Sequence, residues 1–206
     1  MQEIKDLTAY RLALKEKILQ TATSAFVEKG IKDVKMDDIA NALSISKRTL
    51  YEIYGDKETL LFEVVKRHTQ NKREILRKYG EEGHHVIEII LEAYRLRVKE
   101  SHDVNPAFYE DIIRYPQIVK YMESQREENK EQFMLFMQRG VKEGLFRPDV
   151  DYTILPHLFE AIAQYVMKTN LYNKYSLEQI FTNLLLVPLR GFSTEKGLKI
   201  LNEAKF

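Results

Sequence analysis

The placement of helix-breaking residues constrains the fold of this chain more than any other feature of its sequence. All five prolines, at positions 106, 116, 148, 156 and 188, follow residue 105, and the first 80 residues hold only the glycines at 30, 55 and 80. Because proline and glycine interrupt helices most readily, this first part is predicted to form helices joined by tight turns. Strand-like alternation is weak throughout, so the expected fold class is all-α.

Apolar residues at helical spacing define four helices in this first part of the chain. Gly30 has the position of a C-terminal cap for the first helix, and Ser46 has that of an N-cap for the third. The second and third helices have about eight residues each and are joined by a turn of about three, which is the spacing of a helix-turn-helix. The predicted helices span residues 8–29, 36–43, 47–54 and about 57–79.

The third predicted helix has a core-facing side and an outward side. Leu50 and either Ile53 or Tyr54 are expected to point inward. Residues three and four apart lie next to one another on a helix surface. The outward side is therefore predicted to carry Lys47, Arg48, Tyr51 and Glu52.

This helix suits a nucleic acid. The free amides at a capped N-terminus favour a phosphate, Arg48 can present two donors to a guanine edge, and Thr49 and Tyr51 can donate to phosphate oxygens. Each basic residue could instead be a solvated surface side chain. Residues 1–80 hold 16 Lys and Arg against 12 Asp and Glu, whereas residues 81–206 hold 16 against 19. This charge balance permits the first part to bind DNA but does not require it.

Residues 18–61, ILQTATSAFVEKGIKDVKMDDIANALSISKRTLYEIYGDKETLL, resemble the DNA-binding domain of the TetR family of bacterial transcriptional regulators. The resemblance implies that Ser46–Tyr54 form the recognition helix and that Thr49, Tyr51 and Lys57 hold the DNA backbone. The features that match, in order and without gaps, are Ala22, Phe26, Gly30, Ile39-Ala40, Ile45-Ser46, Thr49-Leu50-Tyr51, Tyr54, Lys57 and Leu60-Leu61.

Three positions depart from the common pattern of the family. Lys35 stands where a threonine often caps the second helix, Ser44 replaces a turn glycine, and Arg48 replaces a frequent glycine on the recognition helix. None of them changes the spacing of the helices. Because Arg48 enlarges the surface that reads bases, the operator of this protein should not be inferred from those of its relatives.

The residues and the resemblance together predict a DNA-binding site. Tyr54 could equally be a packing residue. Base or near-base contacts are predicted for Lys47, Arg48 and Tyr51, and contacts to the DNA backbone for Ser46, Thr49, Tyr54 and Lys57.

The predicted organisation has three parts. Residues 1–56 form a DNA-binding domain with its helix-turn-helix at about 36–54, residues 57–80 form a connecting helix, and residues 81–206 form an effector-binding and dimerisation domain. Asp151 is expected to cap a helix, and Pro188 to bend the last one near Leu184. Helices of the last part are predicted at about 84–102, 106–114, 116–143, 153–173 and 177–192.

The last two of these helices, at about 153–173 and 177–192, are apolar over more than one stripe. Such helices need a second packing surface, which a four-helix bundle between two subunits would provide. The alternative is a fully internal helix in a monomer. The resemblance favours the homodimer, because the family dimerises through its last two long helices.

A small apolar or aromatic effector is expected, since many members of the family bind an inducer and no basic cluster in these helices indicates an acidic one. Aromatic walls with a few polar groups are typical of such pockets, although each residue could instead belong to the core. The candidate pocket residues are Tyr94, His102, Phe108, Tyr109, Phe133, Met137, His157, Gln164 and Tyr165.

Several other classes of protein are not supported. The chain has no cysteine, which excludes disulfides and cysteine-based zinc sites. His84 and Glu88, four residues apart, could hold a metal, but an exposed loop is the better explanation for them. No signal peptide, membrane span, cofactor-binding motif or catalytic motif is present.

The sequence therefore predicts a cytoplasmic, homodimeric, ligand-responsive transcriptional repressor that is not an enzyme and needs no cofactor or metal. Each subunit would place its recognition helix in the major groove of a palindromic DNA operator. The alternative is a protein-interaction adaptor that keeps the helix-turn-helix and acts without a small effector.

Overall fold

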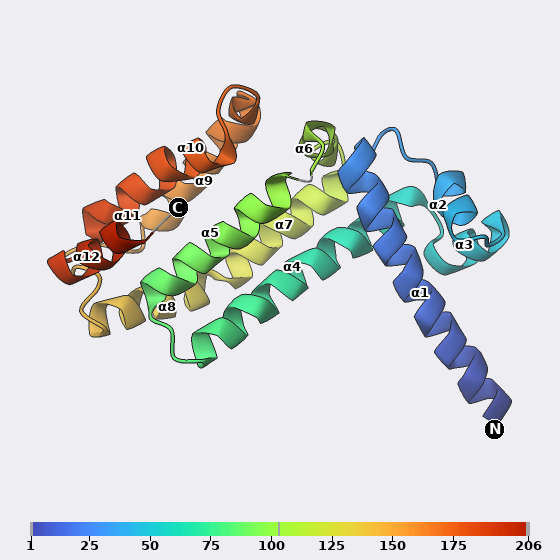
Figure 1. Ribbon diagram of the computed structural model, residues 1–206, viewed down its shortest axis with the longest axis horizontal. Helices are drawn as coiled ribbons and strands as arrows, with labels where there is room; N and C mark the ends of the chain where they lie inside the picture. The colour runs from blue at the N-terminus through green and yellow to red at the C-terminus, as the bar shows by residue number, and fades with distance from the viewer. Residues whose placement is uncertain (1, 103, 205–206) are drawn as a thin grey trace. The chain divides into compact units, whose positions relative to one another are not determined.

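The computed structural model describes residues 2–102 and 104–204 (Figure 1). This part of the chain is all-α, and it contains no strand beyond one isolated antiparallel bridge between Phe146 and Ser193. It forms two compact units. Unit 1 comprises Met1–Lys72 and Asp103–Met122, and unit 2 comprises Arg73–His102 and Glu123–Phe206.

Unit 1 contains the helices of the predicted helix-turn-helix. The second and third helices lie where they were predicted, within one residue at each end, whereas the first begins six residues earlier than expected. The helices are α1 (Gln2–Lys29), α2 (Met36–Ala42), α3 (Lys47–Tyr54), the start of α4 (Lys57–Glu81), α6 (Pro106–Ile112) and the start of α7 (Pro116–Glu128).

The core of unit 1 is built from apolar residues at helical spacing on these helices. Phe26 of α1, Leu50 of α3 and Leu60 of α4 are completely buried. Burial of side chains of this size contributes roughly 1.5–3 kcal/mol each. The remaining members of the cluster include Ile18, Ala22, Ile39, Ala40, Leu61 and Ile118.

The loop after α1 is fastened to α6. Gly30 has a φ of +83° and its amide donates to the carbonyl of Phe26 at 3.0 Å, which confirms it as the C-terminal cap of α1. A Cβ on Gly30 would lie 2.9 Å from the Cβ of Ala107. The amide of Lys32 donates to the buried carboxylate of Asp111 at 2.6 Å. Two elements far apart in the sequence thus fix the approach to α2.

Residues 103–122 differ from the predicted organisation, which assigned them to the second domain. They pack within unit 1, where the amide of Asn105 donates to the carbonyl of Val27 at 2.8 Å and the ring of Tyr121 meets that of Phe62 at 5.2 Å. These contacts join residues tens of positions apart, so no local signal announces them.

Unit 2 is interrupted more often than the sequence predicted. It contains the end of α4, α5 (Val86–His102), the end of α7, α8 (Lys130–Lys142), α9 (Leu155–Lys168), a 3₁₀ turn (Leu171–Asn173), α10 (Leu177–Ile180), a π-helical turn (Phe181–Leu185), α11 (Leu186–Phe192) and α12 (Glu195–Glu203).

Three of the expectations for this part were wrong in detail. The helix expected at 116–143 is broken at Asn129, whose side-chain amide donates to the carbonyl of Gln125 and so competes with the helical backbone. Asp151 does not cap α9 but accepts from the amide of Thr153 at 3.0 Å in the preceding turn. The helix α12 had not been expected. The bend predicted near Leu184 falls within the π-helical turn Phe181–Leu185.

The core of unit 2 is closed by unusually near contacts between backbone and side chains. A Cβ on Gly140 of α8 would lie 2.1 Å from Cδ2 of Phe146, and one on Gly197 of α12 would lie 2.4 Å from the carbonyl oxygen of Leu145. Phe146 is buried and its ring meets that of Phe192 at 5.1 Å. The helices α8 and α11 therefore meet at the ring of Phe146, and α12 packs against the backbone at Leu145.

In the part of the chain that the structure describes, no helix is long and apolar enough to cross a bilayer.

Candidate nucleic-acid interface

The turn between α2 and α3 depends on a residue in a left-handed conformation. Ser44 has a φ of +53°, and its amide donates to the carbonyl of Asn41 at 3.0 Å. The amide of Ile45 donates to the carbonyl of Ala40, also at 3.0 Å. A non-glycine residue in this region carries steric strain, which explains why glycine is the common choice at this turn.

The start of α3 is capped as the sequence predicts. The Ser46 hydroxyl accepts from the amide of Thr49 at 3.0 Å, and the two hydroxyl oxygens lie 2.8 Å apart. Leu50 and Tyr54 are the buried residues of the helix, so the side expected to face outward is the exposed one. The remaining free amides of the first turn stay available to an anion.

Lys47 is held by the neighbouring helix. Its Nζ lies 2.8 Å from the carboxylate of Asp37 in α2 and 5.9 Å from the centroid of the Tyr51 ring. The hydrogen bond and the charge of Asp37 raise the pKa of Lys47 above its ordinary value. Both side chains of the ion pair are at least half exposed, so the pair contributes little to the stability of the fold.

Arg48 forms a second ion pair, within α3. Its Nε donates to Oε1 of Glu52 at 2.8 Å, one helical turn further on. The side chain of Arg48 is 87% exposed and that of Glu52 is 50% exposed. The hydrogen bond and the charge of Glu52 raise the pKa of Arg48. The guanidinium therefore extends into solvent while one of its nitrogens is fixed.

Lys57, at the start of α4, lies in a more crowded setting. Its Nζ donates to the carbonyl oxygen of Lys32 at 3.2 Å. Burial lowers the pKa of Lys57, and the nearby carboxylates of Asp111, Asp33 and Asp38 oppose that shift. The loop between α1 and α2 therefore holds the ammonium of Lys57 in place, whereas the ammonium of a mobile surface lysine would have no fixed position.

Tyr54 does not belong to this surface. Its side chain is only 3% exposed, and its hydroxyl donates to the carbonyl of Lys15 in α1 at 3.3 Å. Burial raises the pKa of Tyr54 well above its ordinary value. The predicted contact of Tyr54 with the DNA backbone is contradicted by this burial, and its role is to pack α3 against α1.

The structure thus brings Ser46, Lys47, Arg48, Thr49 and Tyr51 together on α3 and sets Lys57 one turn beyond its end. Two acidic residues were not predicted as part of the site. Glu52 lies four residues after Arg48, and this spacing could have identified it. Asp37 could not have been found in this way, because only the packing of α2 on α3 brings it to Lys47.

The residues predicted to line an effector pocket are divided between the two units. Phe108 and Tyr109 lie in α6 of unit 1, whereas Tyr94, Phe133 and Met137 lie in unit 2. Tyr94 is buried and stacks on Phe181 with ring centroids 3.6 Å apart, and Met137 is a core residue. Three further predicted residues, His157, Gln164 and Tyr165, are exposed on α9, and the side chain of His102 lies outside the described residues.

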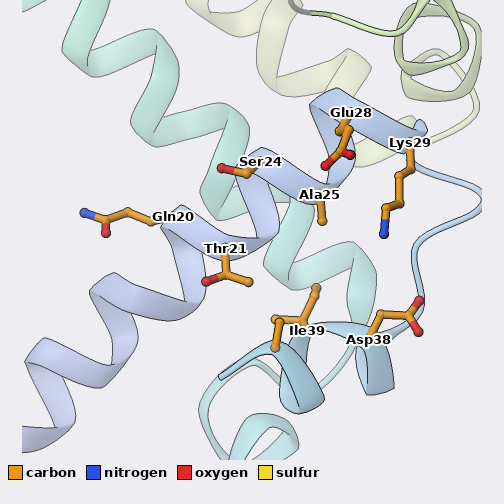
Figure 2. A pocket seen from close by; sticks show the side chains of 9 residues that line it. Gln20, Thr21, Ser24, Ala25, Glu28, Lys29, Asp38 and Ile39 are labelled. Atoms are coloured by element: carbon orange, nitrogen blue, oxygen red, sulfur yellow. The ribbon is translucent and has the colours of Figure 1, made fainter. Parts of the chain in front are cut away.

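A groove of about 400 Å³ lies elsewhere, in unit 1 between α1 and α2 (Figure 2). Gln20, Ser24 and Glu28 come from α1, and Asp38 and Ile39 come from α2. None of the predicted pocket residues lines it.

His84 and Glu88 form a hydrogen bond, with Nδ1 and Oε2 3.3 Å apart. The His84 ring stacks on Tyr79 at 3.7 Å. Among the described residues, no group of three or more metal-ligating side chains is placed to hold an ion. The two residues act together as a structural contact at the turn between α4 and α5.

Comparison with known proteins agrees with this description. Residues 18–64 match the sequence model of the family described as bacterial regulatory proteins, tetR family. The HTH-type transcriptional repressor KstR2 of Rhodococcus jostii is 26% identical over 153 residues, which cover 71% of this chain and 74% of the repressor. The HTH-type transcriptional regulator YezE of Bacillus subtilis is 26% identical over 148 residues, or 67% of this chain and 76% of that protein.

Solved structures share the fold. A transcriptional regulator from Saccharomonospora viridis in complex with choline superimposes with a TM-score of 0.70 at 17% identity, covering 89% of this chain and 99% of that one. A transcriptional regulator from Cytophaga hutchinsonii gives a TM-score of 0.69 at 21% identity, with 87% and 98% covered.

Proposed function

This chain belongs to the TetR family of bacterial transcriptional regulators through its domain at residues 18–64, and from that premise we propose that it is a homodimeric, ligand-responsive repressor that binds a palindromic operator. It is a DNA-binding regulator, as its relatives are. The observation that carries the proposal is the capped helix α3, which directs Lys47, Arg48 and Tyr51 outward from a buried base of Leu50 and Tyr54.

In the proposed complex α3 lies in the major groove. Lys47, Arg48 and Tyr51 contact bases or the edge of the groove, and Arg48 is long and exposed enough to reach a guanine. Ser46, Thr49 and Lys57 contact the DNA backbone. Tyr54 is excluded from this set because its hydroxyl is bonded inside the unit.

An exposed apolar stripe supports the homodimer. Ile154, the N-cap of α9, and Leu158 and Tyr165 within α9 recur at helical spacing and are 61%, 41% and 58% exposed. Val187 of α11 is 58% exposed. Several exposed apolar side chains on one face of a helix often mark a protein interface. Burying it against the same stripe of a second copy produces two-fold symmetry, and two-fold symmetry requires an operator with two inverted half-sites.

The effector is proposed to be a small apolar or aromatic molecule that binds within residues 81–206. The stacked rings of Tyr94 and Phe181 in unit 2 supply aromatic surface of the required kind. Binding would favour one separation of the two reading helices over another, and the operator would accept only one of them.

Selection of binding sites from random DNA, at physiological salt and with purified protein, tests the proposal. Recovery of an inverted repeat is expected. Sequence-independent, salt-sensitive binding, or no binding, would contradict it and favour the protein-interaction adaptor. Because a copurified effector could also block binding, the selection is repeated after unfolding, removal of small molecules and refolding.

A further inference from the structure

The Arg48–Glu52 pair has a geometry that selects among the targets available to an arginine. Glu52 holds Arg48 through Nε at 2.8 Å. None of the hydrogen bonds found among the described residues uses the two terminal nitrogens of Arg48. Because a guanidinium is planar and rigid, a carboxylate on the Nε side leaves the Nη1–Nη2 edge facing away from it. This edge carries the paired donors that match O6 and N7 of guanine.

The charge of Glu52 favours bases over phosphates. An unpaired arginine on a DNA-facing helix is attracted to the nearest phosphate, which carries a full negative charge and no sequence information. A carboxylate within hydrogen-bonding distance neutralises that attraction and repels phosphates directly. The edge of a guanine carries no net charge, so Glu52 repels it far less than it repels a phosphate.

Lys47 provides the contrast on the same surface. Its partner Asp37 comes from α2, and the ammonium is a compact charge on a flexible stem that can rotate toward a phosphate. Both pairs lower the net charge of the reading surface, but only the pair of Arg48 and Glu52 fixes the direction of a planar donor. The two acidic residues therefore have different expected roles.

We propose that Glu52 is a specificity-determining residue of the reading helix, which orients Arg48 toward a guanine in each half-site and keeps it from the phosphates. The inference rests on the proposed function, since it presupposes that α3 reads DNA. An acidic side chain on a surface expected to be basic would thereby help to choose the base. Glu52 acts here through Arg48, as a positioning residue.

The experiment compares site selection by the wild-type protein, Glu52→Gln and the matched control Asp37→Asn, each with a salt titration on random DNA. In Glu52→Gln the preference for guanine at one position of each half-site should fall about tenfold. The affinity for random DNA should rise, and its salt dependence should steepen by about one phosphate contact per subunit. Asp37→Asn should also bind random DNA more tightly, but should keep the guanine preference.

Glu52→Ala removes any hydrogen bond that the amide of glutamine could still make, and should show the same losses at least as strongly. A wild-type inverted repeat that persists unchanged in Glu52→Gln and Glu52→Ala would overturn the inference and leave the proposed function intact. Equal loss of guanine preference in Asp37→Asn would also overturn it, because general charge would then explain the effect. Absence of any selected sequence for the wild-type protein would reject the proposed function itself.

Discussion

The outward side of α3 and the surroundings of Gly140 use their residues in opposite ways. On α3 the decisive side chains are exposed and paired, as in the Arg48–Glu52 contact at 2.8 Å, where Arg48 is 87% exposed. Around Gly140 the decisive feature is the absence of a side chain, because the ring of Phe146 occupies the space that a Cβ would need. The comparison indicates that function and stability are carried by different parts of the chain and can be changed separately.

The largest expected effect is on stability, in Gly140→Ala. Alanine has the higher helix preference by about 1 kcal/mol, but its Cβ would lie 2.1 Å from Cδ2 of Phe146. Steric conflict in a filled core outweighs helix preference, and a loss of about 3 kcal/mol is expected in urea unfolding. Gly191→Ala is the control, since Gly191 is helical with open space around its Cα, and it should stabilise by about 0.5–1 kcal/mol. Equal effects of the two substitutions would remove the distinction between the two regions.

Arg48→Ala should weaken binding to the selected operator by about 1–3 kcal/mol and relax base preference at one position. Its unfolding midpoint should match that of the wild-type protein, since the side chain contacts no core residue and its ion pair is exposed. Titration of specific and random DNA measures the effect. An equal loss on both would identify Arg48 as a phosphate contact.

Lys57→Ala should weaken binding to specific and random DNA alike, by about 1 kcal/mol, and should reduce the salt slope by about one per subunit. The reason is that a lysine held by the carbonyl of Lys32 is placed to meet a phosphate and has no geometry for reading bases. Lys199→Ala is the control, since the Lys199 side chain is exposed on α12, and it should leave the slope unchanged. A wild-type slope in Lys57→Ala would remove Lys57 from the interface.

Tyr54→Phe tests the residue of α3 that belongs to packing. Loss of the hydrogen bond to Lys15 should cost about 1 kcal/mol of unfolding free energy, with DNA affinity unchanged. Burial raises the pKa of Tyr54, so above the ordinary tyrosine value of about 10 the unfolded chain loses this proton while the folded protein retains it. The stabilisation that the raised pKa of Tyr54 gives the folded protein is therefore complete below about pH 10, and it falls as the pH rises further.

The wild-type protein should accordingly lose more stability than Tyr54→Phe when urea unfolding is measured between pH 9 and about 11. Equal losses of unfolding free energy in the wild-type protein and in Tyr54→Phe over this pH range would mean that the pKa of Tyr54 is not raised. A change in salt slope on DNA would instead return Tyr54 to the interface.

The smallest expected effect is a gain, in Ser44→Gly. Glycine tolerates the φ of +53° at this turn without steric strain, while its greater freedom in the unfolded chain offsets part of the benefit. A net stabilisation of about 0.5 kcal/mol is expected from thermal unfolding. Ser44→Ala is the control, since it keeps the strain and should not stabilise. Stabilisation by both substitutions would show that the serine side chain, and not its φ, is unfavourable.

Local signals predicted unit 1 well and unit 2 less well. The ends of α2 and α3 and the caps at Gly30 and Ser46 depend on residues no more than four positions apart, and all were predicted from the sequence. The break at Asn129 is also local, but an asparagine inside a polar helix is a weak signal. Local signals could not separate pocket residues from core residues such as Met137, because aromatic and apolar residues in cores and in pockets have the same spacing.

The sequence by itself determined the all-α class, the helix-turn-helix and the outward direction of Lys47, Arg48 and Tyr51, because helical periodicity and capping act over a few residues. Only the tertiary structure decided that Tyr54 is buried against α1, that Asp37 reaches Lys47, and that residues 103–122 pack in unit 1. Each of these depends on which helices meet, and that choice is made by burial of apolar surface summed over the whole unit, which no short stretch of sequence contains.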